Sequence, residues 1–156
     1  MKKFSIYFYT FFIILFFKNY ESYSNLNDDN LKKEVIKTIN MQIGNKNFTI
    51  KLFDNNAAQN LITQLPLTLD MKELNGNEKY SYLPKKLPAD SQNISEIKAG
   101  DLMLFSSDCL VLFYKNFHTF YSYTKIGYIE NITELTAALG NGNIKVKLNI
   151  LYWHYS

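Results

Sequence analysis

The sequence predicts a mainly β protein whose strands, about eight in number, close into a barrel accompanied by two short helices. Apolar and polar residues alternate in many short segments, residues typical of turns separate these segments, and only two stretches change to helical spacing. Closure is favoured over an open sheet because it removes exposed strand edges. The 156 residues are 47% hydrophobic and 16% aromatic, which suffices for one domain with a packed core.

Residues 1–24 are typical of a signal peptide. A pair of lysines precedes the almost wholly apolar stretch 4–17, and Ser22 and Ser24 place small residues at the −3 and −1 positions of a cleavage site. The apolar stretch has 14 residues, which as a helix would span roughly 21 Å. This is shorter than the ~30 Å hydrocarbon core of a bilayer. We therefore expect an exported protein, periplasmic or secreted, that is cleaved near Ser24 and meets the membrane only through this segment. An uncleaved anchor is the alternative.

The rest of the chain is close to neutral. Loss of residues 1–24, with three lysines and one glutamate, lowers the formal net charge from +3 to +1. That charge gives no electrostatic reason to expect a nucleic-acid partner. Cys109 is the only cysteine, which excludes an intrachain disulfide, and its place at the start of an apolar run favours burial over reactivity.

We expect a flexible polar spacer at 25–38 and the barrel domain at 39–156. The spacer is assigned from its charge-rich composition, and the domain from the change to a period of two at its first residues. The domain opens with a β-hairpin, because residues 39–43 and 48–52 alternate on either side of a turn at Gly44.

A short helix follows the hairpin. Apolar residues at helical spacing predict a helix over 55–65, with Asp54 or Asn55 as its N-cap and Pro66 as its end. Alternation then returns at 67–71 and predicts a strand, which an Asn-Gly turn signal ends.

The middle of the chain predicts four further segments. Residues 79–83 form a strand, and the prolines in 84–95 mark a loop. The apolar segments 101–105 and 109–114 predict two adjacent strands. Because the second of them has no alternation, we expect both of its faces to be covered.

The last elements are a strand, a helix and a strand. Residues 121–130 predict the first strand, and residues 144–150 alternate and predict the last one. A helix over 131–139 is expected to start with a box-like pairing of Asn131 and Glu134 and to end at a glycine. We expect the following apolar side chains to face the core: Phe48, Ile50, Leu52, Leu110, Leu112, Ile132, Ile144, Val146 and Leu148.

Several motifs occur in an order that is similar to that of a known family. They are LFD at 52–54, AAQNL at 57–61, GDLML at 100–104, LVLFY at 110–114 and KIGYI at 125–129. The set resembles cyclophilins. The chain is more similar to a bacterial group of cyclophilin-like domains, often exported, over residues 39–150, and the pattern of that group is matched by LPLTL at 65–69, LNGNE at 74–78, GD at 100–101 and YTKIG at 123–127. The resemblance implies a closed cyclophilin-like barrel. It implies no agreed function.

One departure from cyclophilins bears on mechanism. Cyclophilins resemble one another in a Phe-His-Arg segment whose guanidinium binds the prolyl carbonyl. Here all 17 basic residues are lysines, and the corresponding segment, about 67–82, contains neither Arg nor His. Lys79 offers a charge but no rigid bidentate fork, whereas the barrier of ~18–20 kcal/mol is lowered only by directed electrostatics.

We therefore expect a non-catalytic binding module rather than an enzyme. A prolyl isomerase with a degraded, Arg-free site is one alternative. An accessory domain for a flavodoxin-like redox partner is another, because relatives of this bacterial group resemble domains found beside flavodoxin-like ones.

Other common chemistries lack their residues. His118 and His154 are the only histidines, and no Ser, Cys or carboxylate stands at a spacing that marks either as a catalytic base. Two histidines and one cysteine without a local cluster predict no metal site. The Gly-Asn-Gly at 140–142 follows a helix and precedes a strand, the reverse of a phosphate-binding loop. We predict no catalytic residue, no metal and no cofactor.

Aromatic residues gather in the strands that would flank the groove of such a barrel. Tyrosine combines an apolar face with a polar tip, which suits a peptide or a ring-shaped ligand, although barrel packing and a codon bias toward Phe and Tyr are the alternative explanation. We predict binding of an unknown peptide or small ligand by these residues: Asn77, Lys79, Tyr80, Tyr82, Phe113 and Tyr121.

Overall fold

The structure, a computed structural model, describes residues 35–151. The expected signal peptide, with its cleavage site at Ser24, and most of the expected spacer therefore lie outside the described residues. Strand β1 begins at Val35, inside the range expected to be spacer, so it is longer than the alternation of 39–43 indicates. Within 35–151 no helix has the length and apolar character to cross a membrane.

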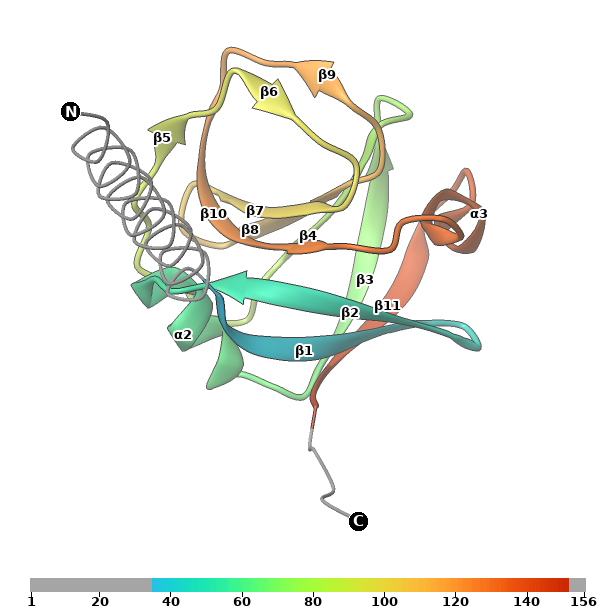
Figure 1. Ribbon diagram of the computed structural model, residues 1–156, viewed down its shortest axis with the longest axis horizontal. Coiled ribbons are helices and arrows are strands. Elements are labelled where there is room, and N and C mark those ends of the chain that lie inside the picture. The colour runs from blue at the N-terminus through green and yellow to red at the C-terminus, as the bar shows by residue number, and fades with distance from the viewer. Residues whose placement is uncertain (1–34, 152–156) are drawn as a thin grey trace, which may run out of the picture. The chain divides into compact units, whose positions relative to one another are not determined.

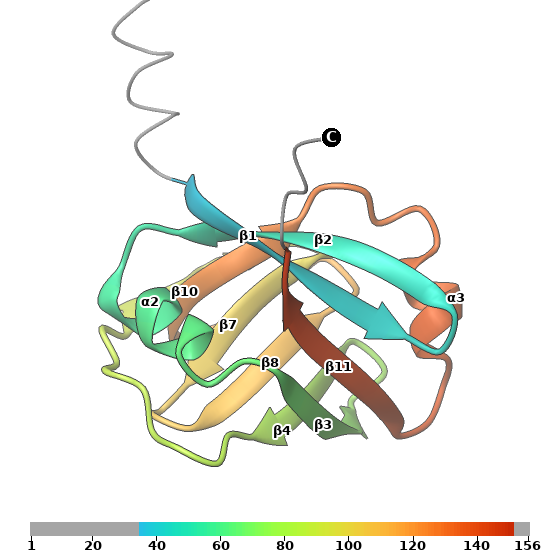
Figure 2. The same ribbon diagram turned by 90° about the horizontal axis from the view of Figure 1, so that it is seen from below.

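Eight strands close into an antiparallel barrel, as the sequence predicts (Figures 1 and 2). Their order is β2-β1-β11-β3-β4-β8-β7-β10, and β10 pairs with β2 to complete the ring. The strands are β1 Val35–Ile43, β2 Lys46–Phe53, β3 Leu67–Leu74, β4 Glu78–Tyr82, β7 Asp101–Phe105, β8 Cys109–Phe113, β10 Ser122–Ile129 and β11 Ile144–Ile150.

A glycine makes the closure possible. Gly127 of β10 lies opposite Leu52 of β2, and a Cβ atom at this position would stand 2.3 Å from the main-chain oxygen of Lys51. No side chain fits at that distance, so the two strands approach closely enough to pair only because residue 127 is glycine.

The two helices lie at opposite ends of the barrel (Figures 1 and 2). Helix α2, Asn56–Ile62, is capped by Asn55, whose Oδ1 accepts a hydrogen bond from the Ala58 amide at 2.9 Å. Of the two predicted candidates, Asp54 and Asn55, it is therefore Asn55 that caps the helix. The helix ends three residues before the Leu65–Pro66 pair and is thus shorter than predicted.

Helix α3, Leu135–Leu139, does not start as predicted. Asn131 accepts from the Thr133 amide in a local turn, and Glu134 makes no capping bond because its carboxylate binds Lys46 at 2.8 Å. Since the helix begins after Ile132, that side chain lies in the preceding turn and is 40% exposed, so its predicted core position is wrong.

Two apolar clusters lie on the two sides of strand β8. Leu110 and Leu112 belong to the larger cluster inside the barrel, and Val111 and Phe113 belong to a smaller cluster on the outer face. All five residues of β8 are buried, which confirms that both faces are covered. Of the other predicted core residues, Ile132 is exposed as described above, Ile144 is only partly buried against the larger cluster, and the rest are buried.

Three strands of two residues each cover the outer cluster. Gln92–Asn93, β5, pairs with β10; Glu96–Ile97, β6, pairs with Phe117–His118, β9. We call the pair of β6 and β9 the arch. In Figure 1 the arch lies at the top, above β7 and β8 and outside the ring of barrel strands. The region predicted as one loop, 84–95, thus contains a strand and leads into a second.

Candidate functional site

A groove of about 750 Å³ lies on the outer face of the barrel, where strands β4 and β8 face β9 of the arch. It extends from the turn between β3 and β4 to the segment that follows β9. The lining residues are Leu74, Asn75, Asn77, Glu78, Tyr80, Tyr82, Phe105, Cys109, Val111, Phe117, His118, Thr119, Phe120, Tyr121 and Tyr123.

Strand β4 supplies the floor of the groove through its alternation. Successive side chains of a strand point to opposite faces, so Glu78, Tyr80 and Tyr82 share the groove face. The same strand pairs with β8, where Tyr80 lies opposite Val111 and Tyr82 opposite Cys109, and both partners also line the groove.

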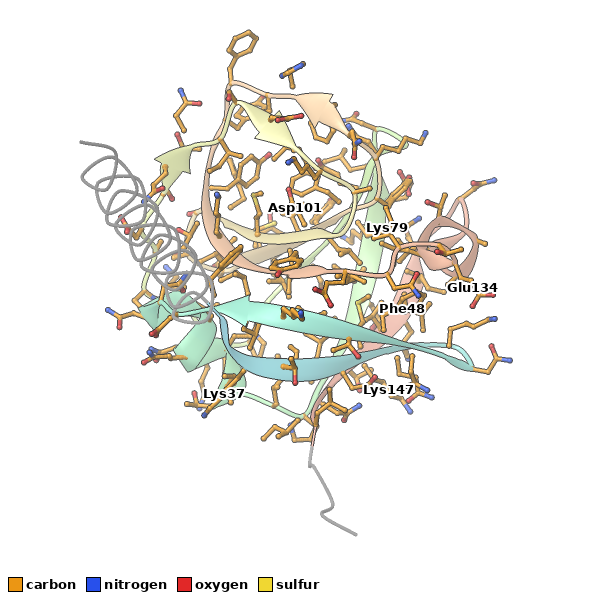
Figure 3. All side chains as sticks on the ribbon, viewed as in Figure 1. Lys37, Phe48, Lys79, Asp101, Glu134 and Lys147 are labelled. Carbon is orange, nitrogen blue, oxygen red and sulfur yellow. The ribbon has the colours of Figure 1, made fainter. Side chains whose placement is uncertain are left out.

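Lys79, which was predicted to bind ligand, lies on the other face of β4. Its side chain is fully buried, and its Nζ donates to Glu73 Oε2 at 2.5 Å and to the carbonyls of Gly140 and Gly142 at 2.9 and 2.6 Å. Figure 3 shows Lys79 on the side of the barrel nearest the loop between α3 and β11. The predicted set therefore mixed the two faces of one strand.

The structure brings four of the six predicted residues into the lining. Asn77, Tyr80, Tyr82 and Tyr121 line the groove. Phe113 lies beneath it, fully buried, with its ring 5.5 Å from each of the rings of Phe117 and Tyr123. Ligand binding by these residues stays a prediction.

The aromatic rings of the groove hold one another in place. Tyr80 and Tyr82 pack edge to face at 6.2 Å, and Phe105 packs edge to face against Tyr121 at 6.1 Å. Such pairs add about 0.5–1.5 kcal/mol to the gain from burial. Phe120 is 99% exposed, and Tyr82 and Tyr121 are 65% and 66% exposed, so the groove presents a large aromatic surface to solvent.

Glu78 is the functional candidate that the sequence interpretation missed. Its side chain lines the groove although the residue is only 9% exposed, and within residues 35–151 it has no hydrogen bond or ion pair. Burial, reinforced by the nearby charge of Glu73, raises the pKa of Glu78 above its ordinary value. The sequence did contain a signal for Glu78. Side chains two positions apart in a strand share a face, so a groove that includes Tyr80 and Tyr82 should include Glu78 as well.

Two further polar groups stand in or beside the lining. The buried Oδ1 of Asn77 has no hydrogen-bond partner in the described part of the chain. His118 has its Nδ1 3.2 Å from the carbonyl oxygen of Ser95, which fixes the orientation of the ring.

The one thiol of the described groove lining is held in its protonated form. Burial raises the pKa of the Cys109 thiol to about 11, so this side chain is protonated near neutral pH and is no thiolate nucleophile. Among residues 35–151, no group of three or more His, Cys, Asp or Glu side chains is placed to hold a metal ion.

Comparison with known proteins gives one family and one solved fold. The sequence model of a cyclophilin-like family matches residues 41–149. The solution structure of a hypothetical protein from Archaeoglobus fulgidus resembles the chain with a TM-score of 0.52, at 13% sequence identity, over 76% of this chain and 97% of that one. At this identity the likeness shows the fold alone. No curated protein matches the chain.

Proposed function

Since the chain belongs to the cyclophilin-like family, we propose that its domain is a non-catalytic binding module that holds an extended peptide in the groove beneath the arch. The observation that carries the proposal is the lining itself. A volume of about 750 Å³, within the ~300–1,000 Å³ of ordinary ligand sites, is bounded by rings that pack on one another.

Preorganised aromatic rings favour binding for two reasons. Rings that are already held by their neighbours lose little conformational freedom when a ligand arrives, so less of the interaction energy is lost to ordering. Exposed aromatic surface also gains about 25 cal/mol for each Å² that a ligand removes from water. A peptide suits the groove because alternate side chains of an extended chain face one way and fit a strand-lined surface.

The isomerase alternative finds no support in the position of Lys79. That ammonium lies within the segment that corresponds to the catalytic one of cyclophilins, but it is held by Glu73 and two carbonyls on the opposite face of β4. The groove lining holds no lysine or arginine among the residues described.

The proposal is tested by selecting peptides and locating them. A displayed library of random heptapeptides is panned on the purified protein, and the selected peptides are titrated by NMR. Tyr82→Ser and Tyr121→Ser should each weaken binding at least tenfold, because both rings are exposed in the groove and their loss leaves the core intact. Tyr128→Ser is the matched control, since its ring packs on Phe53 away from the lining.

Two results would overturn the proposal. One is a library that yields no peptide with an affinity better than about 1 mM. The other is a set of selected peptides whose affinity is unchanged by the groove variants, which would place their site elsewhere on the protein.

A further inference from the structure

The groove combines aromatic rings with a single buried acid, and we propose that the peptide residue it recognises is a lysine or arginine whose cation pairs with Glu78. This inference rests on the proposed function, because it names the side chain that a bound peptide would place in the groove.

The fold leaves the carboxylate of Glu78 without a partner. The residue is only 9% exposed, its carboxylate opens to the groove, and no side-chain hydrogen bond or ion pair joins it to another of residues 35–151. Burying a charge without a partner is expensive, and proteins normally pair such a group or neutralise it. A cation brought by a ligand would supply the missing partner and turn this cost into a gain in affinity.

The part of the chain that the structure describes places no lysine at the groove. Lys79 is the next residue, but its ammonium is fully buried on the other face and is held by Glu73. Glu78 is the only acid in the lining, and the described lining residues include no lysine or arginine. The groove therefore carries a carboxylate for which its described lining offers no lysine or arginine, and a bound cation would compensate it.

The rest of the groove lining also suits a lysine or arginine side chain. Lysine and arginine have apolar stems that pack along rings and charged heads that are attracted to ring faces, and Tyr80 and Tyr82 stand on the same strand face as Glu78. Ammonium and guanidinium groups only donate hydrogen bonds. They match the carboxylate of Glu78, the acidic acceptor of the described lining.

A metal ion fits this site less well than an organic cation. Divalent ions take several oxygen, nitrogen or sulfur ligands, and the described groove offers one carboxylate. Seven of the lining residues are aromatic, which favours a ligand with apolar surface around its charge.

The experiment uses four capped peptides, Ala-Leu-X-Leu-Ala, in which X is Lys, Arg, Gln or Glu. Each is titrated into the purified protein and followed by NMR. We expect the Lys or Arg peptide to bind at least tenfold more tightly than the Gln peptide, and the Glu peptide to bind most weakly. In Glu78→Gln, which keeps the size of the side chain, the Lys, Arg and Gln peptides should bind within about twofold of one another.

The controls separate this inference from the proposed function. Glu96→Gln, at an acid of β6 that is exposed and outside the lining, should leave the preference for Lys and Arg intact.

If all four peptides bind equally and Tyr82→Ser weakens them all, the groove binds peptides but the charge inference is wrong. If none binds, both are wrong. Equally tight binding of n-butylammonium would show that a small amine, and not a peptide, is the ligand.

Discussion

Replacement of Lys79 by methionine should lower the free energy of unfolding by about 3 kcal/mol. Removing one member of a buried ion pair costs about 3–5 kcal/mol because it leaves the other charge uncompensated. The lower end applies here, since Glu73 is 20% exposed and keeps its hydrogen bond from Tyr114 at 2.9 Å. The carbonyls of Gly140 and Gly142 lose their donor as well, so the cost does not fall below that range.

Urea unfolding measures this effect directly. With a slope of about 1.5 kcal/mol per M, a loss of 3 kcal/mol lowers the midpoint by roughly 2 M. Lys145→Met is the matched control, because its side chain is 64% exposed and its Nζ lies 3.7 Å from Asp70, and it should leave the midpoint unchanged. Adding Glu73→Gln to Lys79→Met should restore at least 1 kcal/mol, since no uncompensated charge then remains.

The reasoning is refuted if Lys79→Met stays within 1 kcal/mol of the wild-type protein. It is also refuted if the double variant is less stable than the single one, because the carboxylate of Glu73 would then not be the group that suffers from the loss of Lys79. The first result would mean that the Lys79 side chain contributes packing volume and little else to this end of the barrel.

Three further predictions concern charge, catalysis and processing. Because burial raises the pKa of Glu78, its ionised form destabilises the fold as the pH rises through that pKa. Glu78→Gln should therefore be more stable than wild type in urea at pH 7, and this difference in stability should close below about pH 4. An equal difference at both pH values would contradict the prediction. The protein should not speed cis/trans exchange of an Ala-Pro test peptide beyond its uncatalysed time of tens of seconds, and measured acceleration would restore the isomerase alternative. Mass spectrometry of the exported protein should show a start near Asn25, whereas intact Met1 in a membrane fraction would favour an anchor.

Periodicity predicts well those barrel strands that bury one face, and a continuous apolar run predicts a strand that is buried on both faces. The hairpin of β1 and β2 and the last strand, β11, were found from a period of two, and β8 from its continuous apolar run. The arch was missed because strands of two residues contain no period at all. Their positions depend on contacts with residues distant in the sequence.

Local signals failed where a tertiary partner competes with them. Glu134 has the spacing of a capping residue, yet Lys46, distant in the sequence, binds its carboxylate instead. Asn55 has no such competitor for its Oδ1 and caps its helix as predicted. For the groove, choosing residues by their type was misleading, and the face of the strand on which they lie is what decides. Glu78 and Lys79 are adjacent in the sequence, but Glu78 lines the groove whereas Lys79 is buried on the other face of β4.

The arch is small, so the residues on its side of the groove contribute little to the stability of the barrel and can differ in the ligand that they recognise. β6 and β9 are joined by only two residue pairs, whereas the floor of the groove belongs to strands paired on both sides. Substitutions of exposed residues in and after β9 can therefore change the groove lining at little cost to folding, whereas Ile97 of β6 is fully buried. Relatives that share this barrel are expected to diverge first in the segment corresponding to 118–121, and thereby to bind different ligands on a common floor.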